Sequence, residues 1–290
     1  MNYDSPSEIS ALLRELNIGL KKRWGQNFLI NRGAREKIVK LIDPLPGDII
    51  WEIGPGLGAL TGLIIKTNAE LTVFEIDHGL ANYLEEHFTD AGNFLIVRGD
   101  AVRSWAKYLK EHPEKDKPSK IVGNLPYSSA SAIILSYIRG GLKPDLMIFT
   151  VQKDMANRML AEPRDRDYSS FSVLCQYAYN IHCEGDLQPG SFFPKPEVVS
   201  SVVKLTPREL EVKPVDEKFF FTLVKALFES RRKTLRNNLL TGSGLKAFSK
   251  NLLLKAVELE GIDVGLRSEE LPVEDFVRIA NRIINLKRES

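Results

Sequence analysis

Residues 48–61, DIIWEIGPGLGALT, decide the fold of this chain. The run 48–53 is rich in isoleucine, as buried strands are, and it leads directly into a turn that holds three glycines. Beyond the turn, Leu60, Leu63 and Ile64 recur at helical spacing. The order of strand, turn and helix predicts one unit of an α/β fold with a parallel sheet.

The same alternation continues along the chain. Strands are predicted at residues 71–76, 94–97, 121–123, 146–151, near Ile181 and at 200–205, and helices at 6–16, around 38–42, up to His87, and at 133–138, 154–160 and 170–179. After Pro207 only amphipathic helical patterns follow. We therefore expect an α/β fold with a Rossmann-like sheet and a smaller C-terminal all-helical domain. The expected domains are an N-terminal helical extension at 1–23, the α/β domain at 24–207 and the helical domain at 208–290.

The composition is that of a globular protein. Hydrophobic residues make up 43% of the 290 residues and charged residues 27%, which excludes a disordered or collagen-like chain. No apolar run approaches the roughly 18 residues of a membrane-spanning helix, and the N-terminus lacks a signal-peptide pattern, so we expect a cytoplasmic protein without membrane contact. Cys175 and Cys183 fit neither a zinc site nor a disulfide framework, and the four histidines show no ligand spacing, so no metal is expected.

Basic residues gather in two short runs, although the net charge is only +2. A charge run is commonly just a solvated face of the protein. Two runs that flank a candidate catalytic domain nevertheless favour an anionic polymer as the partner. Trp24, beside the first run, either stacks on RNA or anchors the N-terminal helix. The runs consist of Lys21, Lys22 and Arg23, and of Arg231, Arg232, Lys233 and Arg236.

The glycine-rich turn itself argues against a dinucleotide. Gly54, Gly56 and Gly58 are spaced G-x-G-x-G rather than G-x-G-x-x-G. A pyrophosphate needs the free amino end of a helix, whereas here the acid Glu52 precedes the turn. That carboxylate suits a cationic ligand, or else it is a buried structural acid.

Two further acids follow the next predicted strands. Glu75 lies at the end of the second strand, where a carboxylate can accept both hydroxyl protons of a ribose. Asp100 lies near the end of the third strand, in a position to meet an adenine amine. A ligand with a cationic amino acid end, a ribose, an adenine and no phosphate is S-adenosylmethionine, which we expect as the cofactor.

The tetrapeptide Asn124-Leu125-Pro126-Tyr127 follows the predicted fourth strand. The exocyclic amine of adenine is a poor nucleophile because its lone pair is delocalised into the ring. Two acceptors, the Asn124 side-chain oxygen and a backbone carbonyl fixed in direction by the following proline, can bind its hydrogens and aim the lone pair at a methyl group. Tyr127 can stack on the flat base.

Seven motifs in this order resemble those of the ribosomal RNA adenine dimethyltransferases, and within that family the chain is similar to the bacterial small-subunit enzymes. The match covers nearly the whole chain. The motifs are GQNFL at 25–29, EIGPGLGALT at 52–61, the acids Glu75 and Asp77, GDA at 99–101, NLPY at 124–127, FFPKPEV at 192–198 and FESRRKTLRNNL at 228–239.

The resemblance implies a class I methyltransferase sheet and assigns roles to single residues. The implied catalytic residues are Asn124, Leu125, Pro126, Tyr127 and Phe192, the last as a second aromatic that closes over the base. The implied cofactor contacts are Gln26, Asn27, Leu29, Gly54, Gly56, Glu75, Ile76, Asp100, Ala101 and Asn124. The family dimethylates two adjacent adenines in the 3′-terminal hairpin of small-subunit (16S) ribosomal RNA, within a partly assembled 30S particle. The resemblance thus implies an rRNA adenine-N6 dimethyltransferase with a role in small-subunit biogenesis, and we expect a monomer.

The motifs also contain departures from the family pattern. Ser128 and Ser129 stand where the family commonly has a larger polar residue and isoleucine, and Val199 stands where an aspartate often precedes Ser200. These positions affect the base pocket and the closure of its loop rather than the reaction class. Two alternatives stay open: a nonenzymatic RNA-binding assembly factor, and the same chemistry on large-subunit rRNA.

Overall fold

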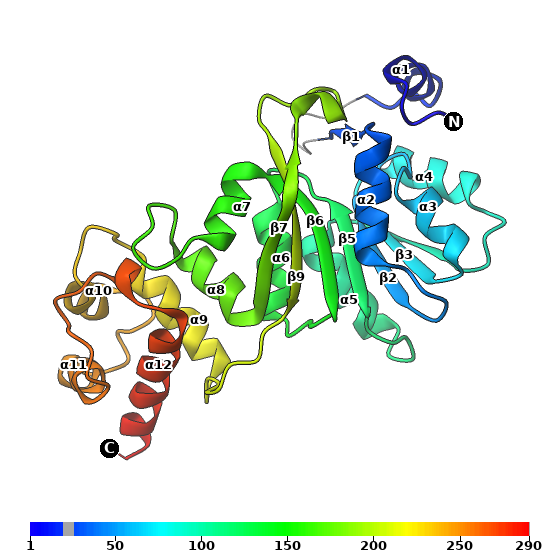
Figure 1. Cartoon of the computed structure of the whole chain (residues 1–290). Coiled ribbons are helices and arrows are strands. Elements are labelled where there is room, and N and C mark those ends of the chain that lie inside the picture. Colours follow the sequence, from blue (N-terminus) through cyan, green and yellow to red (C-terminus); the bar gives the residue numbers. More distant parts are fainter. Residues whose placement is uncertain (20–25, 290) are drawn as a thin grey trace. The chain divides into compact units, whose positions relative to one another are not determined.

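A computed structural model describes residues 1–19 and 26–289 of the chain (Figure 1). The first basic run and Trp24 lie outside the described residues. The chain forms two compact units, of which the first comprises residues 1–156 and 181–207 and the second residues 157–180 and 208–290. The second unit thus includes residues 157–180, which the expected boundary at 207 assigns to the first domain.

A seven-stranded sheet forms the centre of the first unit, in the order β4-β3-β2-β5-β6-β9-β7. Strands β2 to β6 run parallel, and β9 pairs antiparallel with β6. The Rossmann-like sheet expected from the sequence is confirmed, with an antiparallel pair added. The strands are β2 (Ile49–Ile53), β3 (Glu70–Glu75), β4 (Phe94–Arg98), β5 (Lys120–Asn124), β6 (Leu146–Gln152), β7 (Tyr179–Leu187) and β9 (Ser200–Pro207).

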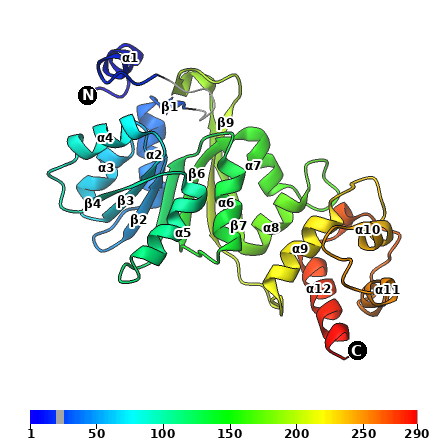
Figure 2. The same cartoon turned by 180° about the vertical axis from the view of Figure 1, so that it is seen from behind.

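Helices cover both faces of this sheet; α2 lies in front in Figure 1, and α5 and α6 lie in front in Figure 2. Ile38 and Ile42 of α2 pack with Ile50, Val73 and Val122 of the sheet to form the core of one face. Such apolar burial is the main stabilising contribution to a fold of this kind. The helices are α1 (Pro6–Glu15), α2 (Arg32–Ile42), α3 (Thr61–Ile64) with the 3₁₀ turn η2 (Ile65–Thr67), α4 (His78–His87), α5 (Ala101–Glu111), α6 (Ala130–Arg139) and α7 (Lys153–Leu160).

Two elements of the first unit were not expected. Helix α5 begins after Asp100, whose side chain caps it, and it buries Ala101, Trp105 and Tyr108. That i, i+4, i+7 spacing is a helical signal that the sequence does contain. A two-stranded antiparallel sheet joins β1 (Phe28–Leu29) to β8 (Phe192–Phe193), which follows the 3₁₀ turn η3 (Pro189–Ser191).

The second unit is helical, as expected for the C-terminal part. Its core contains Phe220, Leu223, Phe276 and Ile279, which are completely buried. Among the described residues, no helix is long and apolar enough to cross a membrane. The elements of the second unit are α8 (Ser170–Ala178), α9 (Glu217–Leu227), α10 (Leu235–Thr241), α11 (Lys250–Leu259), η4 (Ser268–Glu270) and α12 (Val273–Arg288).

Candidate active site

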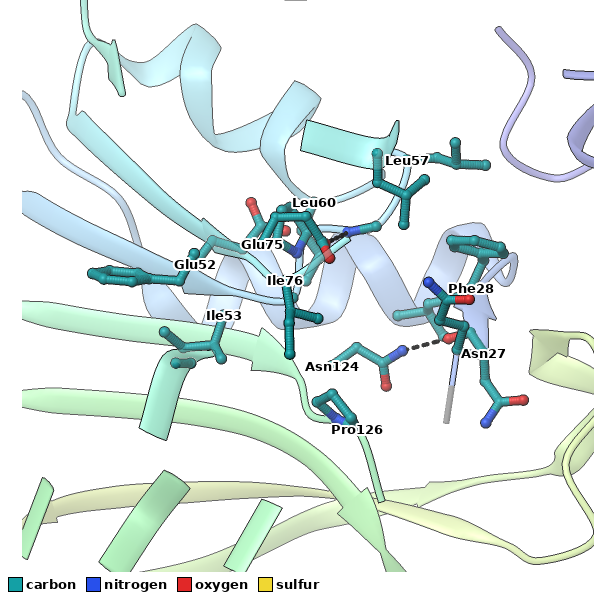
Figure 3. Close-up of a pocket in the computed structure, with 18 of the residues that line it drawn as sticks. Asn27, Phe28, Glu52, Ile53, Leu57, Leu60, Glu75, Ile76, Asn124 and Pro126 are labelled. Atoms are coloured by element: carbon teal, nitrogen blue, oxygen red, sulfur yellow. Dashed lines mark hydrogen bonds between the residues drawn. The ribbon is translucent and has the colours of Figure 1, made fainter. Parts of the chain in front are cut away.

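A cavity of about 310 Å³ opens at the carboxyl ends of β2, β3 and β5 (Figure 3). The strand order reverses between β2 and β5, and such a switch point is where open α/β sheets bind ligands. The volume lies in the range of small-molecule sites. All ten residues expected to contact a cofactor line this cavity, namely Gln26, Asn27, Leu29, Gly54, Gly56, Glu75, Ile76, Asp100, Ala101 and Asn124.

The glycine turn after β2 forms one wall of the cavity. Gly54 and Gly56 adopt φ angles of 65° and 60°, a left-handed conformation that residues with a Cβ rarely adopt. A Cβ at Gly56 would also lie only 3.0 Å from the ring of Phe28. Glycine is therefore required here both by the backbone turn and by the close approach of β1.

Glu75 ends β3 inside the cavity with only 5% of its surface exposed. Its carboxylate accepts hydrogen bonds from the backbone N–H of Asp77 at 2.8 Å and of Gly56 at 3.3 Å. Burial raises the pKa of this carboxyl to about 7. A buried carboxylate at a strand end can accept hydrogen bonds from a hydroxylated ligand, which would favour its charged form.

Glu52 combines both interpretations that the sequence left open. It is 2% exposed, accepts a hydrogen bond of 2.6 Å from the hydroxyl of Thr61, and also lines the cavity. Burial raises its pKa to about 7, and the nearby charge of Glu75 contributes in the same direction. The cavity therefore holds two buried acids whose protonation changes near neutral pH.

Asp100 lies at the exposed side of the cavity, just after β4. One of its carboxylate oxygens caps helix α5 by accepting a hydrogen bond of 2.9 Å from the N–H of Val102. Within residues 1–19 and 26–289 its other oxygen has no hydrogen-bond partner, which leaves an acceptor for an amine.

Asn124, the last residue of β5, has a fixed orientation. Its side-chain nitrogen donates a hydrogen bond of 2.6 Å to the backbone carbonyl of Asn27, as Figure 3 shows. Its side-chain oxygen Oδ1 is buried and has no hydrogen-bond partner among the described residues. A buried acceptor without a partner costs about 1 to 3 kcal/mol, so in a native site it calls for a specific explanation.

The backbone after Asn124 leaves one carbonyl available. The carbonyl of Pro126 accepts hydrogen bonds from the N–H groups of Ser129 and Ala130, at 3.0 and 2.9 Å, and so serves the start of α6. Nothing in the described part of the chain donates to the carbonyl of Leu125, whose side chain is 1% exposed and packs in the core. Leu125 can therefore contribute to a substrate pocket only through its backbone.

The hydroxyl group of Tyr127 is hydrogen-bonded to that of Ser200. The two hydroxyl groups lie 2.6 Å apart, Ser200 is completely buried, and Tyr127 is half-buried. Burial raises the pKa of Tyr127. No role was predicted for Ser200, because nothing in a single sequence indicates a contact between residues so far apart.

Phe192 and Phe193 alternate across the short strand β8. Phe192 is 2% exposed and belongs to the core cluster of Leu29 and Ile38, whereas Phe193 is half-buried beside Phe28. The stacking role of Phe192 stays a prediction, and in this conformation Phe193 is the more accessible of the two rings.

The N-terminal segment, α1 and the residues just before it, contributes groups that the sequence did not indicate. Tyr3 and Ile9 line the cavity, and the hydroxyl of Tyr3 donates a hydrogen bond of 3.1 Å to the carbonyl of Leu57 in the glycine turn. Arg35, 6% exposed, donates to Asp4 and, at 3.1 Å, to the carbonyl of Leu29. These contacts attach the segment around α1 to the cavity wall.

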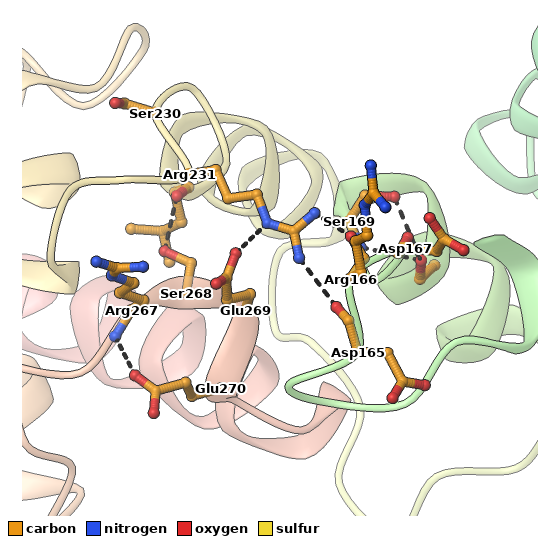
Figure 4. A network of polar contacts seen from close by, with 12 residues as sticks. Asp165, Arg166, Asp167, Ser169, Ser230, Arg231, Arg267, Ser268, Glu269 and Glu270 are labelled. Atoms are coloured by element: carbon orange, nitrogen blue, oxygen red, sulfur yellow. Dashed lines mark hydrogen bonds and ion pairs between the residues drawn. The ribbon is translucent and has the colours of Figure 1, made fainter.

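The second basic run lies in the second unit, in the loop after α9 and in the first turn of α10. Arg232, Lys233 and Arg236 are exposed, and Lys233 lies close enough to the carboxylate of Glu229 to help lower its pKa. Arg231 differs, because its guanidinium group is hydrogen-bonded within the protein (Figure 4). The structure also shows both cysteines free, and no group of metal-ligating side chains occurs among the residues it describes.

The strand order, the glycine turn and the acids at the strand ends define a class I methyltransferase fold. Two solved structures share it. A dimethyladenosine transferase from Plasmodium falciparum has a TM-score of 0.73 and 22% identity, covering 89% of this chain and 97% of that chain. The 23S rRNA methyltransferase ErmE has a TM-score of 0.61 and 21% identity, covering 89% of this chain and 100% of that chain.

The sequence comparisons identify the family. The family model described as ribosomal RNA adenine dimethylase matches residues 18–285. The ribosomal RNA small subunit methyltransferase A of Treponema denticola is 38% identical over 98% of this chain and 97% of its own length. The chain therefore belongs to the ribosomal RNA adenine dimethylase family. This confirms the resemblance, the fold class and the enzyme class predicted from the sequence, whereas the roles of single residues stay predictions.

Proposed function

We propose that this protein transfers methyl groups from S-adenosylmethionine to the exocyclic amines of two adjacent adenines in the 3′-terminal hairpin of small-subunit rRNA. The observation that carries the proposal is the unpartnered oxygen of Asn124, which is held at the cavity by the hydrogen bond to Asn27. A buried acceptor in this position matches a substrate that brings hydrogen-bond donors, as an amine does.

The residues around the cavity fit the cofactor. Glu75 offers a carboxylate to the ribose hydroxyls, the free oxygen of Asp100 offers an acceptor to the adenine amine, and the turn at Gly54 and Gly56 allows close approach of the amino acid part. The buried acid Glu52 places negative charge near the cationic end. S-adenosylmethionine supplies an electrophilic methyl group on a sulfonium centre.

Asn124 and Leu125 would act on the adenine amine. Two acceptors, Oδ1 of Asn124 and the carbonyl of Leu125, bind the two amine hydrogens and favour a tetrahedral nitrogen whose lone pair is no longer shared with the ring. The lone pair forms the new N–C bond while the C–S bond breaks, and the nitrogen then loses a proton to solvent. No side chain needs to act as a base, because the proton leaves after the nitrogen has become cationic.

Recognition of the RNA would fall to the second unit and to the first basic run. Arg231, Arg232, Lys233 and Arg236 lie around the start of α10, and Lys21, Lys22 and Arg23 precede the cavity segment in the sequence. Relatives that are named for the small subunit and match nearly the full length support small-subunit rRNA over large-subunit rRNA. The same proposal includes a partly assembled 30S particle as the substrate, a role in subunit biogenesis, a cytoplasmic location and action as a monomer.

A labelling experiment tests the proposal. The protein is incubated with methyl-labelled S-adenosylmethionine and with small or large ribosomal subunits from cells that lack the modification. We expect label in two adjacent adenines of the small-subunit hairpin and none in the large subunit. Label in the large subunit alone would favour that substrate, and no label, despite binding of the particle, would favour a nonenzymatic assembly factor.

A further inference from the structure

Arg231 belongs to the basic run, yet its guanidinium group is already bonded within the second unit. Its Nε donates to the carboxylate of Glu269, one Nη donates to the carbonyl of Arg166, and the other Nη donates to the carbonyl of Asp165 at 2.9 Å (Figure 4). A guanidinium carries five N–H donors in a rigid fork. Three of these five donors, one on each nitrogen, therefore already serve a carboxylate and two backbone carbonyls.

The loop that carries Arg231 is also held from the inside. The side chain of Asn238, 1% exposed, donates to the carbonyls of Leu227 at 2.8 Å and of Ser230 at 3.0 Å. The hydroxyl of Ser268, 4% exposed, donates to the same carbonyl of Leu227 at 2.7 Å. These bonds satisfy carbonyls at and just after the end of α9, where the helix itself provides no partner. These buried hydrogen bonds therefore hold the loop in a defined conformation.

The loop at residues 162–169 is fastened to the same place. The N–H of Arg164 donates to the carbonyl of Glu269 at 2.8 Å, and the hydroxyl of Tyr168 donates to the carbonyl of Leu271 at 3.0 Å. Arg166 in this loop is exposed, and its side chain has no partner among the residues that the structure describes. Arg231 connects the loop of Arg166 to the loop of the basic run.

We propose that Arg231 is a positioning residue of the RNA surface, and that Arg166 extends this surface. The ion pair with Glu269 of η4 orients the guanidinium of Arg231, whose two Nη groups join the loop after α9 to the loop at 162–169. Arg166 and the side chains of Arg232 and Lys233 then face one segment of RNA backbone. Phosphate groups then contact these three exposed side chains, which are suited to them, rather than Arg231. The inference rests on the proposed RNA-binding function and adds to it a residue that lies far from the basic run in the sequence.

Neutralising Glu269 tests the proposal, because two explanations of RNA binding predict changes of affinity in opposite directions. If the charges near the RNA acted only through their number, Glu269→Gln would remove a negative charge and tighten binding. If Glu269 holds Arg231 in place, the same change weakens binding about tenfold, as the loss of one charge-assisted hydrogen bond does. Glu162→Gln is the matched control, because Glu162 lies in the loop at 162–169 with Arg166 and its side chain is exposed without a partner in the described structure. We expect it to leave binding unchanged or slightly tighter.

Two further variants separate contact from positioning. Arg231→Lys keeps the charge but loses the fork, since one ammonium cannot serve three acceptors in this arrangement. We expect it to bind RNA as weakly as Glu269→Gln, whereas a direct phosphate contact would be largely preserved by lysine. Arg166→Ala removes one exposed side chain, and it should reduce the slope of log K against log salt by about 0.7 to 0.9.

The measurement is the dissociation constant of the full-length protein for unmodified small subunits over a series of salt concentrations. Thermal unfolding of each variant serves as the control for folding. Tighter binding by Glu269→Gln, or an unchanged salt slope for Arg166→Ala, would overturn the inference. A wild-type protein that binds small subunits without any salt dependence would instead refute the RNA surface of the proposed function.

Discussion

The cavity of the first unit and the Arg231 loop of the second unit use similar polar groups in opposite ways. Asn124 has its nitrogen bonded and its oxygen left without a partner among the described residues. Arg231 has donors bonded at both ends of its guanidinium fork. Asn124 is oriented by one hydrogen bond and keeps its oxygen available for a ligand. Arg231 instead uses its donors for contacts within the second unit. A polar group that lines a cavity and lacks a partner is thus a candidate for binding a ligand, whereas a group with its partners inside the fold acts structurally.

Removing the open acceptor should have the largest effect. We expect Asn124→Ala to lower the single-turnover rate of methyl transfer by about 10²- to 10³-fold, as the loss of one preorganised hydrogen-bonding group in a site does. Binding of S-adenosylmethionine, measured by calorimetry, should change little.

Thr150 provides a matched control for this variant. It is paired in register with Asn124 on the neighbouring strand, and its buried hydroxyl also lacks a partner among the described residues, but it does not line the cavity. Thr150→Val should therefore keep normal turnover. Normal turnover in Asn124→Ala would refute the role of the open oxygen.

The next effect concerns the cofactor end of the cavity. Glu75→Ala removes a carboxylate whose charge-assisted hydrogen bonds to a ribose are worth roughly 1.5 to 3 kcal/mol each. We expect the affinity for S-adenosylmethionine to fall about 10- to 100-fold in calorimetry. An unchanged affinity would mean that Glu75 serves only the backbone N–H groups it already binds.

The pH dependence of cofactor binding tests the same acid without removing it. The pKa of Glu75 is raised to about 7 by burial, so at pH 6 the free protein holds this carboxyl mainly protonated and at pH 8 mainly ionised. The ionised form accepts the ribose hydroxyls, so affinity should increase about tenfold from pH 6 to pH 8. Glu75→Gln should abolish this increase, and a pH dependence that survives in Glu75→Gln would assign it to another group, such as Glu52.

The smallest effect is expected for the hydrogen-bonded pair of Ser200 and Tyr127. Ser200→Ala leaves Tyr127 without its hydroxyl partner and should lower methyl transfer about fivefold, the value of one hydrogen bond. Because Ser200 is proposed to act through Tyr127, the same change in a Tyr127→Phe background should have no further effect. An equal loss in both backgrounds would show that Ser200 acts independently of the tyrosine hydroxyl.

The positions of the cavity residues could be predicted because they follow directly from strand ends. Gly54, Glu75 and Asn124 each end or follow a strand with a clear apolar pattern, and parallel strands bring these ends to one edge. The two-residue strands β1 and β8 could not be predicted, since so short a strand has no periodicity. A single sequence likewise contains no signal for contacts between residues that lie far apart in it.

One distant pair and one adjacent pair of residues show the limits of prediction at the candidate sites. Arg231 lies in the loop after α9 and Glu269 in η4, and only the packed second unit reveals that they meet. Likewise, Phe192 and Phe193 are equivalent as letters in a proline-rich loop. Which of the two rings enters the core is decided by the register of β8 on β1.

The carbonyl that orients Asn124 belongs to Asn27, directly before β1, and β1 pairs with β8. During synthesis from the amino end, the glycine turn and the NLPY segment leave the ribosome well before residues 192–193. A nascent chain that ends before β8 would thus contain nearly every proposed catalytic group yet lack the strand that holds Asn27 in place. The reactive geometry would then be completed only late in translation, when the last part of the first unit has emerged.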